Sequence, residues 1–193
     1  SSRLREIWEG KEGGRDLRVI YLDINNLKQI NDRQGHQAGD ILIKDMAEYI
    51  KGIASRPEDI MARIGGDEFL LFLPNDKRQK EQYITPYLAK YPNLRFSAGV
   101  VDLDLNNIYQ NVLNKLMLTN EGTYENIRIK VLEEVKKGRN IADKLMYEAK
   151  SLGEGNTYIR FQNEIDLENE IQLSKEDTPT NTSLQPLHNS PLP

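Results

Sequence analysis

Two adjacent carboxylates interrupt an otherwise apolar segment, IMARIGGDEFLLFL, which spans residues 60–73. Asp67 and Glu68 follow two glycines, so they fall in a turn where glycine permits left-handed backbone between two strands that we expect to be buried. A third acid, Asp23, stands near the end of the apolar run RVIYLDI. If these strands are neighbours, the carboxylates converge at one sheet edge and repel each other unless a cation lies between them.

Oxygen ligands of this kind on a small scaffold select Mg²⁺ or Mn²⁺, which complete their coordination with water and phosphate oxygens. The three acids therefore predict a nucleotide phosphoryl-transfer site with one or two divalent metals. An ordinary solvated turn is the alternative, because Gly-Asp is common turn chemistry.

A polar segment, NDRQGHQAGD at residues 31–40, separates two predicted helices. Asn31, His36 and Asp40 carry groups that can contact a base edge. A carboxylate facing the N1–H and N2 amine of guanine, beside an amide, selects guanine over adenine. Helix capping is the alternative, with Asp40 as an N-cap and Asn31 as a helix stop. The two roles are compatible.

The elements that position these residues follow from the spacing of apolar side chains. A tight hairpin forces one antiparallel strand pair, and the longer connections leave room for helical crossovers. We expect an α/β fold, an α+β sandwich of the palm or ferredoxin-like type, with a central, mostly antiparallel sheet flanked by helices. Strands are predicted at 18–24, 60–64, 69–73, 94–101 and 156–161, and helices at 3–10, 25–36, 40–53, 76–90 and 141–153, with two amphipathic stretches within 105–138.

Composition excludes several classes of protein. The 193 residues carry a net charge of −4 without a basic stripe, which argues against nucleic acid as a partner. The absence of cysteine excludes thiol catalysis, cysteine-ligated metals and disulfides. No apolar run approaches the roughly 18 residues of a bilayer span, so we expect a cytoplasmic domain without membrane contact of its own. The chain opens SSRLREIW without Met, and we expect a fragment of a longer protein, which leaves room for a membrane anchor elsewhere.

Three blocks of the sequence resemble the GGDEF domain family, the diguanylate cyclases. Residues 65–69 read GGDEF, residues 23–40 resemble the family's D-x-D-x-F-K-x-x-N-D-x-x-G-H-x-x-G-D, and residues 142–150 resemble A-D-x-x-x-Y-x-A-K. Three blocks in the right order are far more specific than a single short motif. We expect a GGDEF domain at 1–162 with a helical insertion at about 105–138, followed by a polar, proline-containing tail or linker at 163–193.

The resemblance implies roles for matching positions. Asp23, the carbonyl of Ile24 and Asp67 would hold two divalent metals, Mg²⁺ or Mn²⁺. Glu68 would assist, and Asp67 would also be the candidate base for the attacking 3′-hydroxyl. The substrate GTP would lie against residues of all three blocks, namely Lys28, Asn31, His36, Asp40, Gly65, Gly66 and Lys150, with Asn31 and Asp40 on guanine and Lys150 at the triphosphate.

The resemblance also implies an activity and its control. Members join two GTP into cyclic di-GMP, a bacterial second messenger, and release two pyrophosphates. Because each subunit carries one GTP, turnover needs a transient homodimer, normally brought together by a sensory or regulatory domain that this fragment lacks.

Many members also carry an R-x-x-D site at which the product inhibits, five residues before the glycine pair. RPED, from Arg56 to Asp59, stands at that spacing. Arginine matches the acceptor edge of guanine in a bidentate way, and aspartate can order the arginine. An unremarkable loop is the alternative.

Some positions depart from the family pattern. Asn25 and Leu27 replace an Asp and a Phe of the second block, neither a metal ligand in the family. After Lys150 the chain reads SLGEGN, which places Glu154 where an Arg is expected to assist the phosphates. A carboxylate there is repulsive to a triphosphate. An active cyclase and a weak or inactive domain that senses GTP or cyclic di-GMP therefore both stay open, with a protein-contact scaffold using 105–138 as a third hypothesis.

Overall fold

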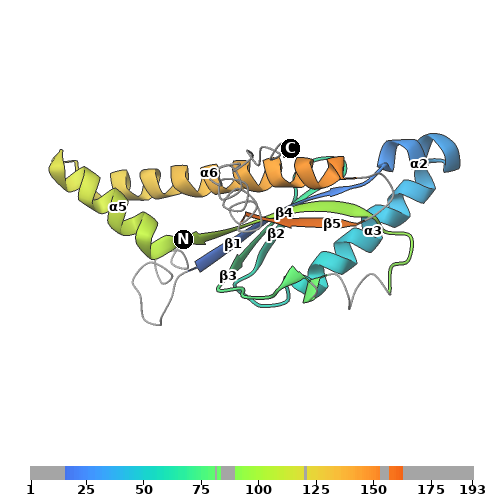
Figure 1. The fold of residues 1–193 in the computed structure, drawn as a ribbon, viewed down its shortest axis with the longest axis horizontal. Coiled ribbons are helices and arrows are strands. Elements are labelled where there is room, and N and C mark those ends of the chain that lie inside the picture. The colour runs from blue at the N-terminus through green and yellow to red at the C-terminus, as the bar shows by residue number, and fades with distance from the viewer. Residues whose placement is uncertain (1–15, 81, 84–89, 120, 153–156, 163–193) are drawn as a thin grey trace, which may run out of the picture. The chain divides into compact units, whose positions relative to one another are not determined.

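The computed structural model describes residues 16–80, 82–83, 90–119, 121–152 and 157–162. Its strands form one five-stranded sheet with the order β2-β3-β1-β4-β5 (Figure 1). All neighbours are antiparallel except β4 and β5, which run parallel. This arrangement confirms the predicted α/β fold with a mostly antiparallel sheet. The strands are β1 (Asp16–Ile24), β2 (Ile60–Arg63), β3 (Glu68–Pro74), β4 (Phe96–Asp104) and β5 (Tyr158–Phe161).

Two helices follow β1 directly in the chain. The helix α2 (Leu27–Gln34) is joined to α3 (His36–Ile53) by Gly35 alone, whose φ of 85° lies in the left-handed region. Because glycine adopts this conformation without strain, the chain turns from one helix straight into the next. The prediction that Asp40 caps the second helix is therefore wrong, since α3 begins at His36 and Asp40 lies inside it.

One long helix replaces two predicted stretches. We expected separate helices before and after residue 140, but α6 (Tyr124–Ser151) is continuous over 28 residues. Gly138 weakens a helix only by about 1 kcal/mol, and here it packs against Leu103 of β4. The N-terminal part of α6 pairs with α5 (Leu105–Leu118) around a small apolar cluster of their own, made of Val112, Leu116, Ile127 and Val131.

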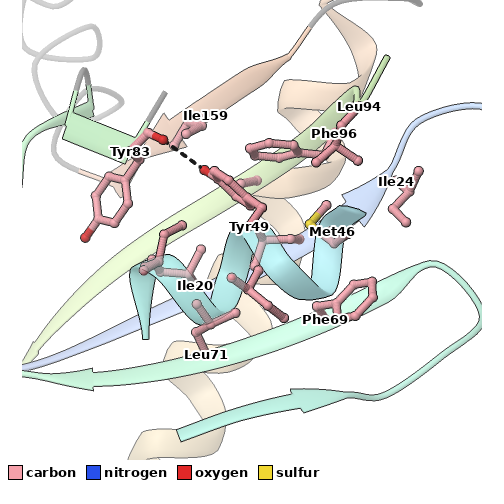
Figure 2. Close-up of a cluster of buried hydrophobic side chains, with 14 of the residues drawn as sticks. Ile20, Ile24, Met46, Tyr49, Phe69, Leu71, Tyr83, Leu94, Phe96 and Ile159 are labelled. Atoms are coloured by element: carbon pink, nitrogen blue, oxygen red, sulfur yellow. Dashed lines mark hydrogen bonds between the residues drawn. The ribbon is translucent and has the colours of Figure 1, made fainter. Parts of the chain in front are cut away.

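The two faces of the sheet have different cover. Side chains of one face, including Ile20, Leu71 and Phe96, pack with Tyr49 of α3 and Tyr83 in the main hydrophobic core (Figure 2). The Tyr49 hydroxyl donates to the main-chain oxygen of Tyr83 at 3.1 Å. The opposite face lies under α6, whose backbone reaches β4 at Gly99. A long helix is thereby held flat against the sheet, and its last turn arrives near the end of β1.

The strand β2 and the segment at residues 76–79 differ from the predicted structure. The strand β2 is an exposed edge strand rather than a buried one, with Ile60 57% and Met61 41% exposed, because only β3 pairs with it. Residues 76–79 are not helical, and the rest of the helix predicted at 76–90 falls partly outside the described residues. The predicted helix at 3–10 and tail at 163–193 also lie outside them. No helix in the described ranges has both the length and the hydropathy to cross a bilayer.

The contact at Gly99 leads to a stability prediction. A Cβ at this position would overlap the main-chain oxygen of Ala142 in α6, which cannot move aside like a side chain. We expect Gly99→Ala to lower the free energy of unfolding by about 3 kcal/mol, measured by urea denaturation. Gly138→Ala is the matched control, because its Cβ would meet the flexible side chain of Leu103. Equal losses in the two variants would show that close backbone packing does not set the position of α6.

Candidate functional site

The three predicted metal-site acids, Asp23, Asp67 and Glu68, meet at one end of the sheet. Asp23 of β1 is the register partner of Glu68 of β3. The main-chain N–H of Ile24 donates to the main-chain oxygen of Asp67 at 3.0 Å, which closes the same end. We call Asp23, Asp67 and Glu68 the carboxylate edge. The register confirms that the two strands are neighbours and explains why acids 44 and 45 residues apart in sequence come together.

A lysine from α6 reaches the carboxylate edge. Lys150 Nζ lies 2.6 Å from Asp23 Oδ1, a contact between residues 127 positions apart. Asp23 is only 6% exposed. Burial raises the pKa of Asp23, Lys150 opposes that rise, and the nearby Asp67 and Glu68 add to it. The site therefore concentrates negative charge that one ammonium group partly offsets.

The donor set can be tested against a divalent cation. Within the described ranges, no three His, Asp or Glu side chains lie close enough to form a complete protein cage for a metal. Mg²⁺ does not require such a cage, since it keeps several waters and is bound through one or two carboxylates plus substrate phosphates. Asp23 and Asp67 fit that mode of binding, and a cation would relieve the repulsion from Asp67 and Glu68, which adds to the effect of burial in raising the pKa of Asp23.

The glycine pair acts differently from our expectation. Neither Gly65 nor Gly66 has a left-handed φ, so the predicted positive-φ turn is wrong. Gly65 instead leaves room for Glu68, because a Cβ there would overlap Oε2 and force the glutamate side chain to shift, whereas Gly66 faces open space. Arg63 donates from Nε to the Gly65 oxygen at 3.2 Å and from Nη2 to the Gly66 oxygen at 2.6 Å.

These two carbonyl contacts orient the loop. In a trans peptide the N–H points opposite to the preceding C=O, so the N–H groups of Gly66 and Asp67 point away from Arg63. Successive amides presented in this way favour anions such as phosphate. No role for Arg63 was predicted from the sequence, although a cation two residues before a glycine pair was a visible signal.

The predicted base-reading residues lie on α2 and α3, which follow the site end of β1 directly. Asn31 Oδ1 is buried without a hydrogen-bond partner among the described residues. It fills the space beside Gly39, where a Cβ would overlap it. An unpaired acceptor at this place suits a donor from a ligand. The other predicted substrate residues of the two helices, Lys28, His36 and Asp40, are exposed, and no described contact joins them to the carboxylate edge.

The predicted R-x-x-D pair lies at the other end of β3, roughly 20 Å of strand away from Glu68. Arg56 Nη2 donates to Asp59 Oδ1 at 2.8 Å and to the Pro74 oxygen at 2.8 Å. The Arg56 side chain is 38% exposed, while that of Asp59 is fully covered. Asp59 therefore orders Arg56 from below, and the exposed member of the pair is the arginine.

Two further polar contacts were missed from the sequence. Ser97 Oγ donates to Asn25 Oδ1 at 2.9 Å, so the residue that departs from the family pattern has a structural partner on β4. Tyr21 donates from its hydroxyl to Glu68 Oε1 at 3.2 Å. Burial and the neighbouring Glu68 carboxylate raise the pKa of Tyr21 to about 12. The available signal was a polar side chain two residues before Asp23, on the same face of the strand. Glu154 lies outside the described residues.

Comparisons with known proteins agree with this geometry. The family model described as diguanylate cyclase, GGDEF domain, matches residues 1–94. These residues make up just under half of the chain, and their match makes this part of the chain similar to GGDEF domains. Diguanylate cyclase TpbB of Pseudomonas aeruginosa strain UCBPP-PA14 is 42% identical over 73 residues, which are 38% of this chain and 16% of TpbB. The probable diguanylate cyclase DgcE of Escherichia coli K12 is 31% identical over 101 residues, 46% of this chain and 9% of DgcE.

The GGDEF fold is also found among solved structures. A microbial GGDEF domain, described in a new mode of interaction with cyclic di-GMP, superposes with a TM-score of 0.53 and 23% identity over 80% of this chain and 86% of that one. This similarity concerns the fold. The matches to TpbB and DgcE span only 16% and 9% of those proteins, so the similarity concerns a small part of each.

Proposed function

We propose that this GGDEF domain is a diguanylate cyclase, which condenses two GTP into cyclic di-GMP and two pyrophosphates. The observation that carries the proposal is the carboxylate edge, where Asp23 and Glu68 are register partners and Lys150 arrives from a helix far along the chain. A solvated turn has no need of a buried carboxylate facing two others. The proposed domain spans 1–162, with 105–138 as an insertion and 163–193 as a tail or linker.

The residues of the carboxylate edge and the neighbouring loop would have separate roles in binding metal, accepting a proton and binding phosphate. Asp23, the Ile24 carbonyl and Asp67 would hold Mg²⁺ or Mn²⁺, which when bound supplies charge stabilisation at the phosphoryl oxygens. Asp67 would accept the proton of the attacking 3′-hydroxyl, with Glu68 assisting. The amides of Gly66 and Asp67, oriented by Arg63, would bind phosphate oxygens, and Lys150 would exchange part of its contact with Asp23 for the triphosphate.

Base selection falls to α2 and α3. The unpaired Oδ1 of Asn31 would accept a hydrogen bond from the guanine N2 amine. The exposed Asp40 carboxylate would take the N1–H, and His36 and Lys28 would lie close by. Because adenine has no donor at N1 and no amine at C2, a site built on these two acceptors would leave them unpaired with ATP, which predicts a preference for GTP.

The proposed reaction joins two substrates held by two subunits. Each domain would bind one GTP, so a transient homodimer in which the two carboxylate edges face each other would complete the site. A regulatory or sensory domain elsewhere in a longer protein would control how often two copies meet.

The experiment is an incubation of the protein with GTP and Mg²⁺ or Mn²⁺, followed by chromatography of the nucleotides. We expect cyclic di-GMP and pyrophosphate to form, with a rate per subunit that rises with protein concentration, and we expect Asp67→Asn to form none. Absence of product from the wild type, even at high concentration or as a tethered dimer, would contradict cyclase activity.

A nucleotide sensor without turnover is the second candidate. It is favoured by Glu154, which stands in sequence where the family expects an arginine near the phosphates. Calorimetry separates the two functions, because a sensor binds GTP or cyclic di-GMP while the chromatogram shows no product.

Product feedback through Arg56 gives a separate prediction. Arg56 is the exposed member of the R-x-x-D pair, so its removal takes away the group that would contact guanine. We expect Arg56→Ala to weaken cyclic di-GMP binding at least tenfold while GTP binding is unchanged, measured by calorimetry. Arg128→Ala, at a half-exposed arginine on α6, is the control. Unchanged cyclic di-GMP binding in Arg56→Ala would place the inhibitory site elsewhere.

A further inference from the structure

Tyr21 is a polar side chain inside the central strand, where the surrounding positions are apolar. It is 5% exposed and lies two residues before Asp23, so both side chains stand on the face of the sheet that α6 covers. In the sheet register it faces Leu70 on one side and Gly99 on the other. A phenylalanine would fill the same space, so packing alone does not explain the hydroxyl.

The hydroxyl has a specific partner in the carboxylate edge. It donates to Oε1 of Glu68 at 3.2 Å. The second carboxylate oxygen, Oε2, occupies the space over Gly65 that any Cβ would take. Glu68 thus accepts a hydrogen bond from β1 at Oε1, and its Oε2 lies over Gly65, where the lack of a side chain leaves it room. Within the described residues, Glu68 has no ion pair that would fix it instead.

The helix α6 closes the site from above. Asp143 and Arg139, both on α6, lie close enough to Tyr21 to act on it electrostatically, with opposite signs. The phenol is therefore enclosed between the sheet and the helix, where water competes poorly for its hydrogen bond. A hydrogen bond in such a place holds a flexible side chain such as glutamate in one rotamer, at the cost of its rotational entropy.

We propose that Tyr21 is a positioning residue for Glu68, which fixes the carboxylate so that one oxygen faces a divalent cation at the carboxylate edge. The inference rests on the proposed function of that edge. Groups that orient a metal-binding carboxylate through a hydrogen bond are worth about tenfold or more in metal affinity. Tyr21 contacts neither substrate nor metal in this role, and it acts through Glu68.

The test measures Mn²⁺ binding to the nucleotide-free protein, by the electron paramagnetic resonance signal of free Mn²⁺. We expect Tyr21→Phe to weaken Mn²⁺ about tenfold and Glu68→Gln to weaken it at least as much. In the double variant, Tyr21→Phe should add less than twofold to the effect of Glu68→Gln, because the hydroxyl acts through that carboxylate. Full additivity would overturn the proposal.

Tyr49→Phe is the matched control, since it removes a hydroxyl donor from a buried tyrosine on the other face of the sheet. It should lower stability about as much as Tyr21→Phe does and leave Mn²⁺ affinity unchanged. Equal loss of Mn²⁺ affinity in both variants would overturn the proposal, as it would show a general loss of structure. Should Tyr21→Phe fold poorly, Gly65→Ala is the second variant. Its Cβ would push against Oε2 of Glu68 and displace the carboxylate, so it should weaken Mn²⁺ binding to a similar extent.

The outcomes separate this inference from the proposed function. If the wild type binds Mn²⁺ and forms cyclic di-GMP while Tyr21→Phe binds Mn²⁺ equally well, the positioning role is wrong and the cyclase stands. If the wild type binds no Mn²⁺ with or without GTP, both are overturned.

Discussion

Asp23→Asn is expected to lower the rate of cyclic di-GMP formation by about a thousandfold, a loss typical of removing one main electrostatic group from an active site. Asp23 lies at the centre of the carboxylate edge, buried and in contact with Lys150. Asparagine keeps the shape but removes the charge that would hold a divalent cation. The substitution also leaves the Lys150 ammonium beside a neutral group. We expect this to weaken triphosphate binding less than it weakens metal binding.

The measurement compares initial rates at saturating GTP over a range of Mg²⁺ and Mn²⁺ concentrations. We expect high metal concentrations to restore only a small part of the rate, because a neutral ligand cannot replace a carboxylate. Asp32→Asn is the control, since Asp32 is an exposed acid on α2 and its loss changes the net charge equally. A rate within threefold of the wild type in Asp23→Asn would contradict the assignment of Asp23 as a metal ligand.

Asp76→Asn is expected to lower the free energy of unfolding by about 3 kcal/mol, the range seen when one member of a buried ion pair is removed. Asp76 is 5% exposed. It accepts from Arg78 Nη2 at 2.6 Å and from the Tyr83 hydroxyl at 2.8 Å, and Arg18 Nη1 lies 4.0 Å from it. Removal of this charge leaves two arginines near each other without the carboxylate between them.

The same carboxylate makes stability depend on pH. Burial alone would raise the pKa of Asp76, but hydrogen bonds from Arg78 and Tyr83 outweigh it and hold the pKa at about 2. Each pKa unit is worth about 1.4 kcal/mol. Because the pKa in the folded state is the lower one, the contribution, roughly 2 kcal/mol, is present above pH 4 and is lost as the pH falls toward 2.

Urea unfolding of the wild type and Asp76→Asn between pH 7 and pH 2 checks both effects. The difference in stability between the two proteins should be constant above pH 4 and should shrink below it. Asp16→Asn, which removes a partly exposed acid paired with the exposed Lys77, is the control and should change stability by less than 1 kcal/mol. A pH-independent difference for Asp76→Asn would show that the carboxylate is not held ionised by its neighbours.

The strands at the centre of the sheet were predictable from local sequence. The run around residues 18–24 is apolar and β-branched because β1 is covered on both faces, and the structure extends it only by two residues at its start. The edge strand β2 has the same apolar appearance, so its burial was predicted wrongly. Its exposure depends on the absence of a strand beyond it in the described sheet, which no local pattern encodes.

The helices show the same division. The capping role of Asp40 and the break before residue 141 were inferred from residue preferences, and both were overridden. Gly35 permits an immediate turn between α2 and α3, and packing of α6 on β4 outweighs the weak helix propensity of Gly138. Such preferences are worth less than 1–2 kcal/mol, which tertiary packing easily exceeds.

The sequence by itself determined which chemical groups are present at this site: three acids near strand ends, a glycine pair, and polar residues able to contact guanine, in an order that resembles the GGDEF family. Only the tertiary structure decided which groups touch, namely Lys150 on Asp23, Tyr21 on Glu68 and Arg63 on the loop carbonyls. The reason is physical. Residue type and local pattern set what a side chain can donate or accept, whereas register and the close approach of α6 at Gly99 set its neighbour.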